Sequence, residues 1–190
     1  MKIKVILVGA YAPNHSISNN VLGIGYRKPD GTFMQPYMFK EDLINFKKLT
    51  TGQVIVMGRN TWEAIGGKPL PDRINVVISR NPDFKAEGAK VFRSIEEVIT
   101  YFKGTEQVFF IGGATILEEL IKHYTVDEYI ITFVQNYMYY SDYSDGYLIT
   151  FKLSLENHIK KSSKFFRGYN YMDNKEHDCT IAHYIHKDSL

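Results

Sequence analysis

The chain has 190 residues, enough for one domain with a sizeable core. A formal charge of +2 is too small to argue for nucleic-acid binding, and no apolar run approaches the roughly 20 residues of a membrane helix. The single cysteine, Cys179, excludes an internal disulfide framework and a four-cysteine zinc site. We expect one domain over residues 1–190, acting as a monomer in the reduced cytoplasm without nucleic-acid or membrane partners.

The first predicted element is a strand at residues 4–12 (KVILVGAYA). Its apolar residues run almost without interruption, as in a central strand covered on both faces. The preceding lysines and the small-residue triplet Ala10-Tyr11-Ala12 would also fit a signal peptide, but the early start and the β-branched residues favour the strand. Residues 13–36, rich in Asn, Gly, Ser and Pro, predict a long loop.

Helical patterns and apolar runs then alternate as far as residue 135, which is the signature of a mainly parallel sheet. Helices are predicted at residues 39–49, from about 61, at 94–102 and at 114–124. Strands are predicted at residues 54–58, 75–79, 90–93, 107–113 and 128–135, and then, without helices between them, at 148–154, 163–172 and 179–187. The expected fold is a three-layer α/β domain whose sheet ends in an antiparallel C-terminal edge.

The stretch Gly58-Arg59-Asn60-Thr61 joins a predicted strand to a predicted helix. A helix N-terminus exposes unpaired N–H groups and a partial positive charge, glycine permits close approach, and Arg59 adds a bidentate donor. Asn60 and Glu63 have the spacing of a capping pair. The stretch therefore indicates either an anion site or a capped helix followed by a solvated arginine.

Two further strand ends carry similar residues. Residues 111–115 (IGGAT) match neither G-x-G-x-x-G nor a P-loop, and taken alone they indicate only a tight turn. Ser79 and Arg80 end another strand. Because ligands gather at the carboxyl ends of parallel strands, the three ends together suit a phosphorylated dinucleotide, and the second arginine favours NADP over NAD.

Asp42 lies on the apolar face of the helix predicted at 39–49. Burial would raise its pKa and suit it to act as an acid or as a specific hydrogen-bond acceptor, unless it is a boundary residue that faces solvent. Arg73, just after Pro69-Leu70-Pro71, could clamp a substrate carboxylate or remain a surface charge. The six histidines lack metal-binding spacing and no G-x-S-x-G motif is present, so we expect neither a metal nor serine-hydrolase chemistry.

Taken in order, these stretches resemble dihydrofolate reductase. Residues 54–80 (VIVMGRNTWEAIGGKPLPDRINVVISR) look like the family's strand, M-G-R-x-T-W helix, P-L-P-x-R loop and next strand. Residues 108–117 (VFFIGGATIL) are similar to its I-G-G turn, 41–52 to its acidic helix and 7–12 to its first strand. The resemblance covers residues 1–135 and is thin beyond them.

The resemblance implies NADPH-dependent reduction of 7,8-dihydrofolate for one-carbon metabolism, by hydride transfer to C6 and protonation at N5, and it implies antifolates as inhibitors. Asp42 matches the buried acid that hydrogen-bonds the pterin, and Thr132 matches the hydroxyl that supports it. Tyr37 could hold a water through its hydroxyl. These three are the implied catalytic residues.

The remaining implied residues line two subsites. The backbone carbonyls of Leu7 and Ile111 would receive the pterin amino group, and Arg73 would hold the glutamate carboxylate. The rings would be walled by Leu43, Phe46, Ile65 and Leu70. The implied substrate residues are Leu7, Val8, Leu43, Phe46, Ile65, Leu70, Arg73 and Ile111. The implied cofactor residues are Gly9, Ile17, Gly58, Arg59, Asn60, Thr61, Ser79, Arg80, Gly112, Gly113, Ala114 and Thr115.

The chain departs from the family pattern in three places. The loop that normally ends in Pro-Trp ends in Pro36-Tyr37 and is longer, through about 19–33. Leu117 replaces a tyrosine four residues after the second glycine, and 136–147 replaces the family's Gly-Asp-Thr-Phe-Phe-Pro stretch. These departures suit a phage or otherwise remote member, altered in loop closure and in one contact near the nicotinamide.

Two other functions are compatible with the sequence. The first is NADPH-dependent reduction of another pterin or of a pyrimidine, and a substrate without the folate tail would be insensitive to loss of Arg73. The second is a non-catalytic, nucleotide-binding structural relative, which would bind NADPH without turnover.

Overall fold

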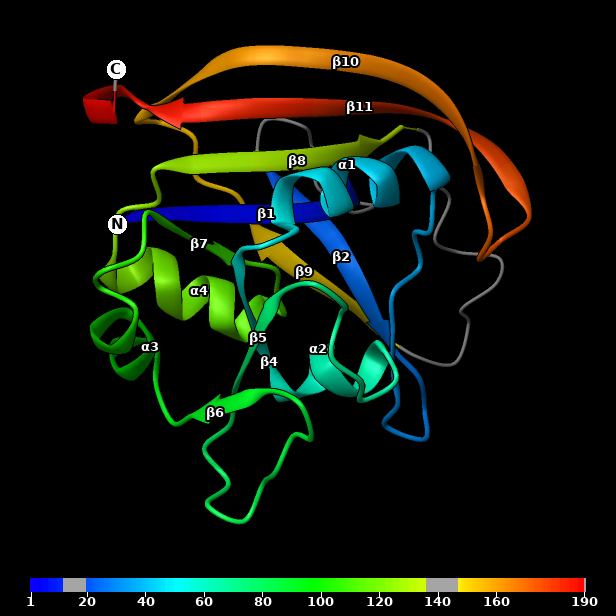
Figure 1. Cartoon of the computed structure of the whole chain (residues 1–190). Coiled ribbons are helices and arrows are strands. Elements are labelled where there is room, and N and C mark those ends of the chain that lie inside the picture. The colour runs from blue at the N-terminus through cyan, green and yellow to red at the C-terminus, as the bar shows by residue number, and fades with distance from the viewer. Residues whose placement is uncertain (12–19, 136–146, 190) are drawn as a thin grey trace.

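A twisted β-sheet runs through the molecule in the computed structural model, which describes residues 1–11, 20–135 and 147–189 (Figure 1). Its main path follows the order β10-β11-β8-β1-β7-β4-β5-β6. In that order the strands are β10 (His158–Asn170), β11 (Lys175–His186), β8 (Glu128–Val134), β1 (Lys2–Tyr11), β7 (Gln107–Phe110), β4 (Val54–Gly58), β5 (Ile74–Ile78) and β6 (Lys90–Phe92).

The two halves of this sheet differ in strand direction. All neighbours from β8 to β6 pair in parallel, while β11 pairs antiparallel with β8, and β10 pairs antiparallel with β11. The expected parallel sheet with an antiparallel C-terminal edge is therefore confirmed. β1 lies at its centre, and the run from Val5 to Ala10 is buried, as the continuous apolar pattern predicts.

The prediction of a long loop at 13–36 was wrong for its second half. β2 (Val21–Arg27) and β3 (Phe33–Met34) form a hairpin there, joined by a turn in which the Gly31 N–H donates to the Lys28 carbonyl. β9 (Tyr147–Lys152) pairs with β2 rather than with the C-terminal edge. The glycines of β2 give the segment a loop-like composition, and the pairing with β9 shifts its register between Gly23 and Gly25.

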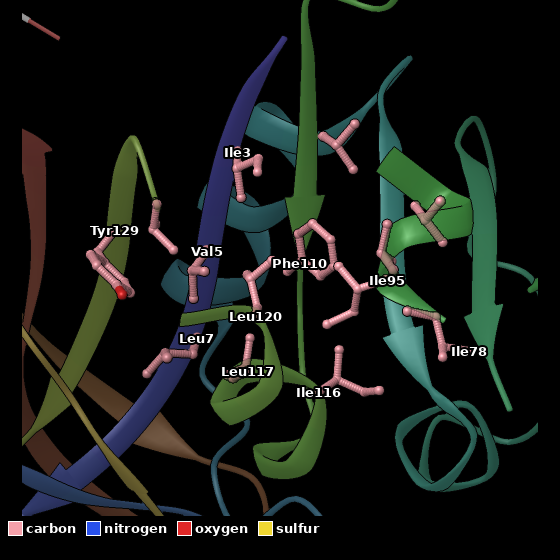
Figure 2. Packing of buried hydrophobic residues seen from close by; sticks show 14 of the residues in the cluster. Ile3, Val5, Leu7, Ile78, Ile95, Phe110, Ile116, Leu117, Leu120 and Tyr129 are labelled. Atoms are coloured by element: carbon pink, nitrogen blue, oxygen red, sulfur yellow. The ribbon is translucent and has the colours of Figure 1, made fainter. Parts of the chain in front are cut away.

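Helices cover both faces of the sheet. They are α1 (Lys40–Thr50), α2 (Arg59–Ala64), α3 (Ile95–Tyr101) and α4 (Ala114–His123), followed by the short 3-10 helix η2 (Lys187–Ser189). Phe46 of α1 and Trp62 of α2 pack in one core cluster, whereas Ile95 of α3 and Leu117 and Leu120 of α4 pack in the other. Figure 2 shows the second cluster, in which α4 side chains meet those of the central strands.

The helix predicted at 94–102 begins as expected, with Ser94 as the N-cap residue of α3. The Glu97 backbone N–H donates to Ser94 Oγ at 3.1 Å, and the Arg93 backbone N–H donates to the Glu97 carboxylate at 2.8 Å. Within the described ranges, no helix is long and apolar enough to cross a membrane.

Candidate active site

Parallel strands β7, β4 and β5 end at the same edge of the sheet, and each end carries a predicted ligand-binding stretch. Gly58 ends β4, and its backbone N–H donates to the carbonyl of Gly112 at 2.8 Å. Ala114 and the exposed Thr115 open α4 directly after this contact, while Ser79 follows β5. The structure thus brings the three stretches together, as the parallel-sheet argument requires.

The glycines at this edge leave room that side chains would fill. A Cβ at Gly113 would lie 3.2 Å from Thr61 Oγ1, and one at Gly112 would lie 3.6 Å from the same atom. A Cβ at Gly58 would lie 2.9 Å from Ile116 Cγ1. Gly112 has φ +118, and its peptide bond to Gly113 is cis. The glycine backbone therefore packs closely against side chains from the first turns of α2 and α4.

Arg59 begins α2 one to two residues before the predicted start, so the expected Asn60–Glu63 capping pair was wrong. Gly58 is the N-cap residue, and no side chain caps it. Asn60 is the second helical residue and is exposed, while Glu63 pairs with Arg59 Nε at 2.6 Å. An exposed arginine that is already paired with a carboxylate would have to exchange that partner for a ligand anion.

Arg93 organises the loop after β5, a role that the sequence did not indicate. Its guanidinium donates to the carbonyls of Ser79 at 2.9 Å, Asn81 at 2.8 Å and Pro82 at 2.8 Å. Ser79 is buried, and Arg80 is exposed. The loop is therefore held through its backbone while the Arg80 side chain faces solvent.

Asp42 and Thr132 meet where α1 crosses β8. Thr132 Oγ1 donates to Asp42 Oδ1 at 2.5 Å, across 90 residues of chain. Asp42 is half-buried, and burial raises the pKa of its carboxyl group, while the hydrogen bond from Thr132 opposes that rise. A carboxyl group with a raised pKa can hold a proton closer to neutral pH than an ordinary aspartate.

Arg73 is held firmly beside α1. Its Nε donates to Thr50 Oγ1 at 2.8 Å, its Nη1 donates to the Pro71 carbonyl at 2.6 Å, and its guanidinium lies over the Phe46 ring at 5.4 Å. Burial lowers the pKa of the guanidinium, and Asp72 opposes this shift. The fork is therefore oriented rather than free to rotate, which suits recognition of a carboxylate.

Asn75, buried within β5, holds the loop that carries Arg73, and the sequence did not single it out. Its side chain accepts from the Leu70 N–H at 2.9 Å and donates to the carbonyls of Leu70 at 2.9 Å and Arg73 at 3.2 Å. The signal in the sequence was an amide side chain within an apolar strand, because such a residue needs hydrogen-bond partners when it is buried. In the structure Asn75 is 3% exposed.

Four of the predicted substrate residues gather in one core cluster on the α1 face. Val8 is buried there, and Phe46, Leu70 and Ile111 pack against it while remaining partly exposed. Val8 also lies opposite Thr132 in the β1–β8 register. The walls and the acid therefore share one face of the sheet.

Three other predicted substrate residues, Leu7, Leu43 and Ile65, lie outside this cluster. Leu7 points into the opposite cluster, so only its backbone could serve the α1 face. Leu43 and Ile65 are 48% and 37% exposed. The helix predicted at 39–49 begins at Lys40, and the fully buried Phe39 is its N-cap residue.

Tyr37 and Gly9 both approach β2. The Tyr37 hydroxyl donates to the Gly23 carbonyl at 2.8 Å, and a Cβ at Gly9 would lie 3.0 Å from that same oxygen. Leu117 is fully buried in the core beneath α4. The predicted cofactor residue Ile17 and the stretch 136–146 lie outside the described residues. In the described part of the chain, no group of His, Cys, Asp or Glu side chains could hold a metal ion.

Fold and site together define an α/β protein whose candidate ligand groups gather at the carboxyl ends of parallel strands. The family model for dihydrofolate reductase matches residues 22–172. The chain belongs to the dihydrofolate reductase family.

Its relatives include dihydrofolate reductases of Mycobacterium leprae (48% identity over 83 residues) and Staphylococcus aureus (43% over 100 residues). These alignments cover 43% and 53% of this chain, and 50% and 59% of the relatives. A bifunctional dihydrofolate reductase-thymidylate synthase of Paramecium tetraurelia is 44% identical over 98 residues, which are 51% of this chain and 20% of the relative. The chain thus spans about half the length of the curated dihydrofolate reductases it matches, and less of the bifunctional relative.

The structural likeness extends further along the chain. A solved dihydrofolate reductase from Enterococcus faecalis, complexed with NADP(H) and RAB-propyl, superposes with a TM-score of 0.72 and 25% identity. The superposition covers 98% of this chain and 97% of the other.

Proposed function

We propose that the chain reduces 7,8-dihydrofolate to 5,6,7,8-tetrahydrofolate with NADPH. The observation that carries the proposal is the half-buried Asp42–Thr132 pair, set on the face where apolar side chains and the oriented Arg73 also lie. Membership of the dihydrofolate reductase family supports the same reaction.

Asp42 is the residue proposed to govern proton delivery to N5. Its carboxyl group hydrogen-bonds the pterin ring, and its raised pKa lets it retain a proton at higher pH than an exposed aspartate. Thr132 orients the carboxylate by donating to Oδ1. The partial burial of the pair limits competition from bulk water for these hydrogen bonds.

The rest of the folate is assigned to the α1 face. Phe46, Leu70 and Ile111 form apolar walls, together with the exposed positions Leu43 and Ile65. The carbonyls of Leu7 and Ile111 receive the pterin amino group, and Val8 lines the floor beside Thr132. Arg73 binds the glutamate carboxylate through the face of its fork not used by Thr50 and Pro71.

The residues at the strand ends fit a phosphorylated dinucleotide. The glycine-lined space at Gly58, Gly112 and Gly113 accommodates backbone contacts to a pyrophosphate, with Ala114 and Thr115 at the start of α4. Phosphate ligands proposed at the same edge are Arg59, Asn60, Thr61, Ser79 and Arg80. The bound cofactor would supply the hydride, and Gly9 is assigned to the vicinity of the nicotinamide. The absence of a side chain at Gly9 lets β2 pack closely against β1.

Further assignments complete the proposal. Tyr37 positions a water through its hydroxyl, and Ile17 contacts the cofactor. Residues 1–190 act as one domain and as a monomer in the cytoplasm, and antifolates compete for the folate end. The single cysteine supports a compartment that does not rely on disulfides.

The test is NADPH oxidation followed by absorbance, with dihydrofolate and with a pterin that lacks the aminobenzoyl-glutamate tail. Formation of tetrahydrofolate, with the tailed substrate preferred, is the expected result. Turnover of the tailless pterin alone would favour the broader pterin reductase. Tight NADPH binding without any turnover would favour a non-catalytic relative and contradict the proposal.

A further inference from the structure

Asn170, at the end of β10, is fully buried and bonds to a segment more than 130 residues away in the chain. Its Nδ2 donates to the Pro36 carbonyl at 3.0 Å, and its Oδ1 accepts from the Met38 N–H at 2.8 Å. Oδ1 also accepts from the Met172 N–H at 3.2 Å. A buried amide with three such bonds fixes the backbone on both sides, because each broken bond would leave a polar group without a partner.

The hydrogen bonds of Asn170 flank Tyr37 and lead directly into α1. The Tyr171 N–H donates to the Met38 carbonyl at 3.0 Å, and Phe39 forms an isolated β-bridge with Asn170. The entry to α1 is therefore paired as if it were a short additional strand along β10. This pairing sets where the helix starts.

Phe39 is the residue from which α1 begins, and no side chain caps the helix there. Its ring is fully buried and makes edge contacts with the rings of Phe166 and His177, both at 6.1 Å between centroids. A Cβ at Gly168 would lie 2.9 Å from the Phe39 ring. The β10–β11 hairpin thus supplies the anchoring that a cap would otherwise provide.

The first turn of α1 is consequently tied to the antiparallel half of the sheet at two points. Phe39 is bound by Asn170 on β10, and Asp42 is bound by Thr132 on β8. Asp42 lies three positions after Phe39, which is less than one helical turn. A shift of the helix start would therefore be transmitted to the carboxyl group.

We propose that Asn170 is a positioning residue for Asp42, which keeps the carboxyl group half-buried and aligned with Thr132. The expected effect on hydride transfer rests on the proposed reaction, whereas the expected effect on the position of Asp42 does not. Loss of the Asn170 bonds would loosen the start of α1 and admit water to the carboxyl group. Asp42 would then titrate nearer to an ordinary aspartate.

The test compares Asn170→Ala with Val98→Ala, a truncation in the opposite core cluster that touches none of these residues. For Asn170→Ala we expect single-turnover hydride transfer about tenfold slower, because small displacements of a catalytic group have effects of this size or larger. Its NADPH affinity should stay within about twofold of wild type, since the cofactor edge is built from other strands. Val98→Ala should leave both quantities near wild type.

A carbon NMR titration of the carboxyl groups, with the Asp42 signal assigned by its loss in Asp42→Asn, reads the position of the group without requiring turnover. A lower Asp42 midpoint in Asn170→Ala, by about half a pH unit or more, is expected. An unchanged midpoint would overturn the inference. Absence of hydride transfer in the wild type would instead refute the proposed reaction and leave the titration decisive for Asn170.

Gly168→Ala provides a second perturbation if Asn170→Ala folds poorly. The added methyl group would press on the Phe39 ring without removing a hydrogen bond. The same direction of change in the Asp42 midpoint is expected, with a smaller loss of rate. A Gly168→Ala protein that titrates and reacts like wild type would contradict the anchoring role of the hairpin.

Discussion

The two ends of the candidate site are held in different ways. At the folate end, Asp42 is bonded to Thr132, and Arg73 is bonded to Thr50 and Pro71. At the cofactor end, the basic side chains are exposed, and Arg59 contacts a neighbouring glutamate and the ring of Phe84. The folate end is preorganised through side chains, whereas the cofactor end is preorganised through backbone.

This difference suits the ligands proposed for each end. A pterin ring and a carboxylate require fixed directions, so oriented side chains reduce the entropy lost on binding. A phosphate presents several equivalent oxygens and can be met by mobile cations around a rigid glycine turn. We therefore expect substitutions at the folate end to have larger and more specific effects than substitutions at the cofactor end.

The largest expected effect on substrate binding follows from removing the oriented guanidinium of Arg73. Arg73→Ala should raise the KM for dihydrofolate about tenfold to a hundredfold with kcat nearly unchanged, because a hydrogen bond to a charged group contributes about 1.5–3 kcal/mol. Steady-state kinetics with each substrate varied in turn measures this. The matched control is Arg80→Ala, which should raise the KM for NADPH and leave that for dihydrofolate unchanged. A higher KM for NADPH in Arg73→Ala and for dihydrofolate in Arg80→Ala would contradict the assignment of the two ends.

The second expected effect concerns the hydroxyl that supports the acid. Thr132→Val keeps the shape and removes the donor to Asp42, so the opposing influence on the carboxyl pKa disappears and the pKa rises further. The pH midpoint of hydride transfer should move upward by about one unit. A midpoint at or below the wild-type value would show that Thr132 does not tune the acid.

The third expected effect concerns the partly buried ion pairs of Glu128 and the contribution of burial to their strength. Glu128 bonds to His183 at 3.2 Å and to Lys4 at 2.7 Å, and these contacts lower the pKa of Glu128 to about 2. Its stabilising effect is complete above its ordinary value of 4.5 and is lost as pH falls from there through about 2. Glu128→Gln should lower the free energy of unfolding by about 1 kcal/mol at neutral pH.

Urea denaturation at neutral pH and near pH 3 measures this effect, and the difference between wild type and Glu128→Gln should shrink at the lower pH. Glu176→Gln is the control, because its contact with Arg167 is 3.5 Å long and both side chains are more than 60% exposed. An equal loss in the two variants would mean that burial adds nothing.

The smallest expected effect is a gain in NADPH affinity. Glu63→Gln removes the competing carboxylate from Arg59, so NADPH should bind about two- to threefold more tightly, as expected for an exposed ion pair of less than about 1 kcal/mol. Fluorescence titration at low and high salt measures the affinity. The gain should vanish at high salt, and weaker binding at low salt would contradict the proposed role of Arg59.

Much of the fold could be predicted because its strands are buried on both faces. Residues 54–58 and 75–79 read as apolar runs, and the glycines that follow β4 and β7 mark where the parallel edge lies. The hairpin at β2 and β3 was missed, since Gly23 and Gly25 lower its apolar content. Its partner β9 lies more than 100 residues away, beyond the reach of local patterns.

The candidate site could be predicted at the residues that carry charge, such as Asp42 and Arg73. Thr132, which donates to Asp42, was expected from the family resemblance. Asn75, Thr50 and Asn170 were not expected, because their partners are determined by tertiary contacts. The assignment of Asn60 as a cap failed for a related reason: a shift of one or two residues in the helix start changes which residue occupies the cap.

The central claim is that a carboxyl group with a raised pKa, Asp42, governs proton delivery. Single-turnover hydride transfer from NADPH to dihydrofolate, measured against pH in wild type and in Asp42→Asn, tests it most directly. We predict a wild-type rate that falls as pH rises through a midpoint above that of an ordinary aspartate, and an Asp42→Asn rate that is about a hundredfold lower and lacks this midpoint. An Asp42→Asn protein with the wild-type rate and the wild-type midpoint would contradict the account.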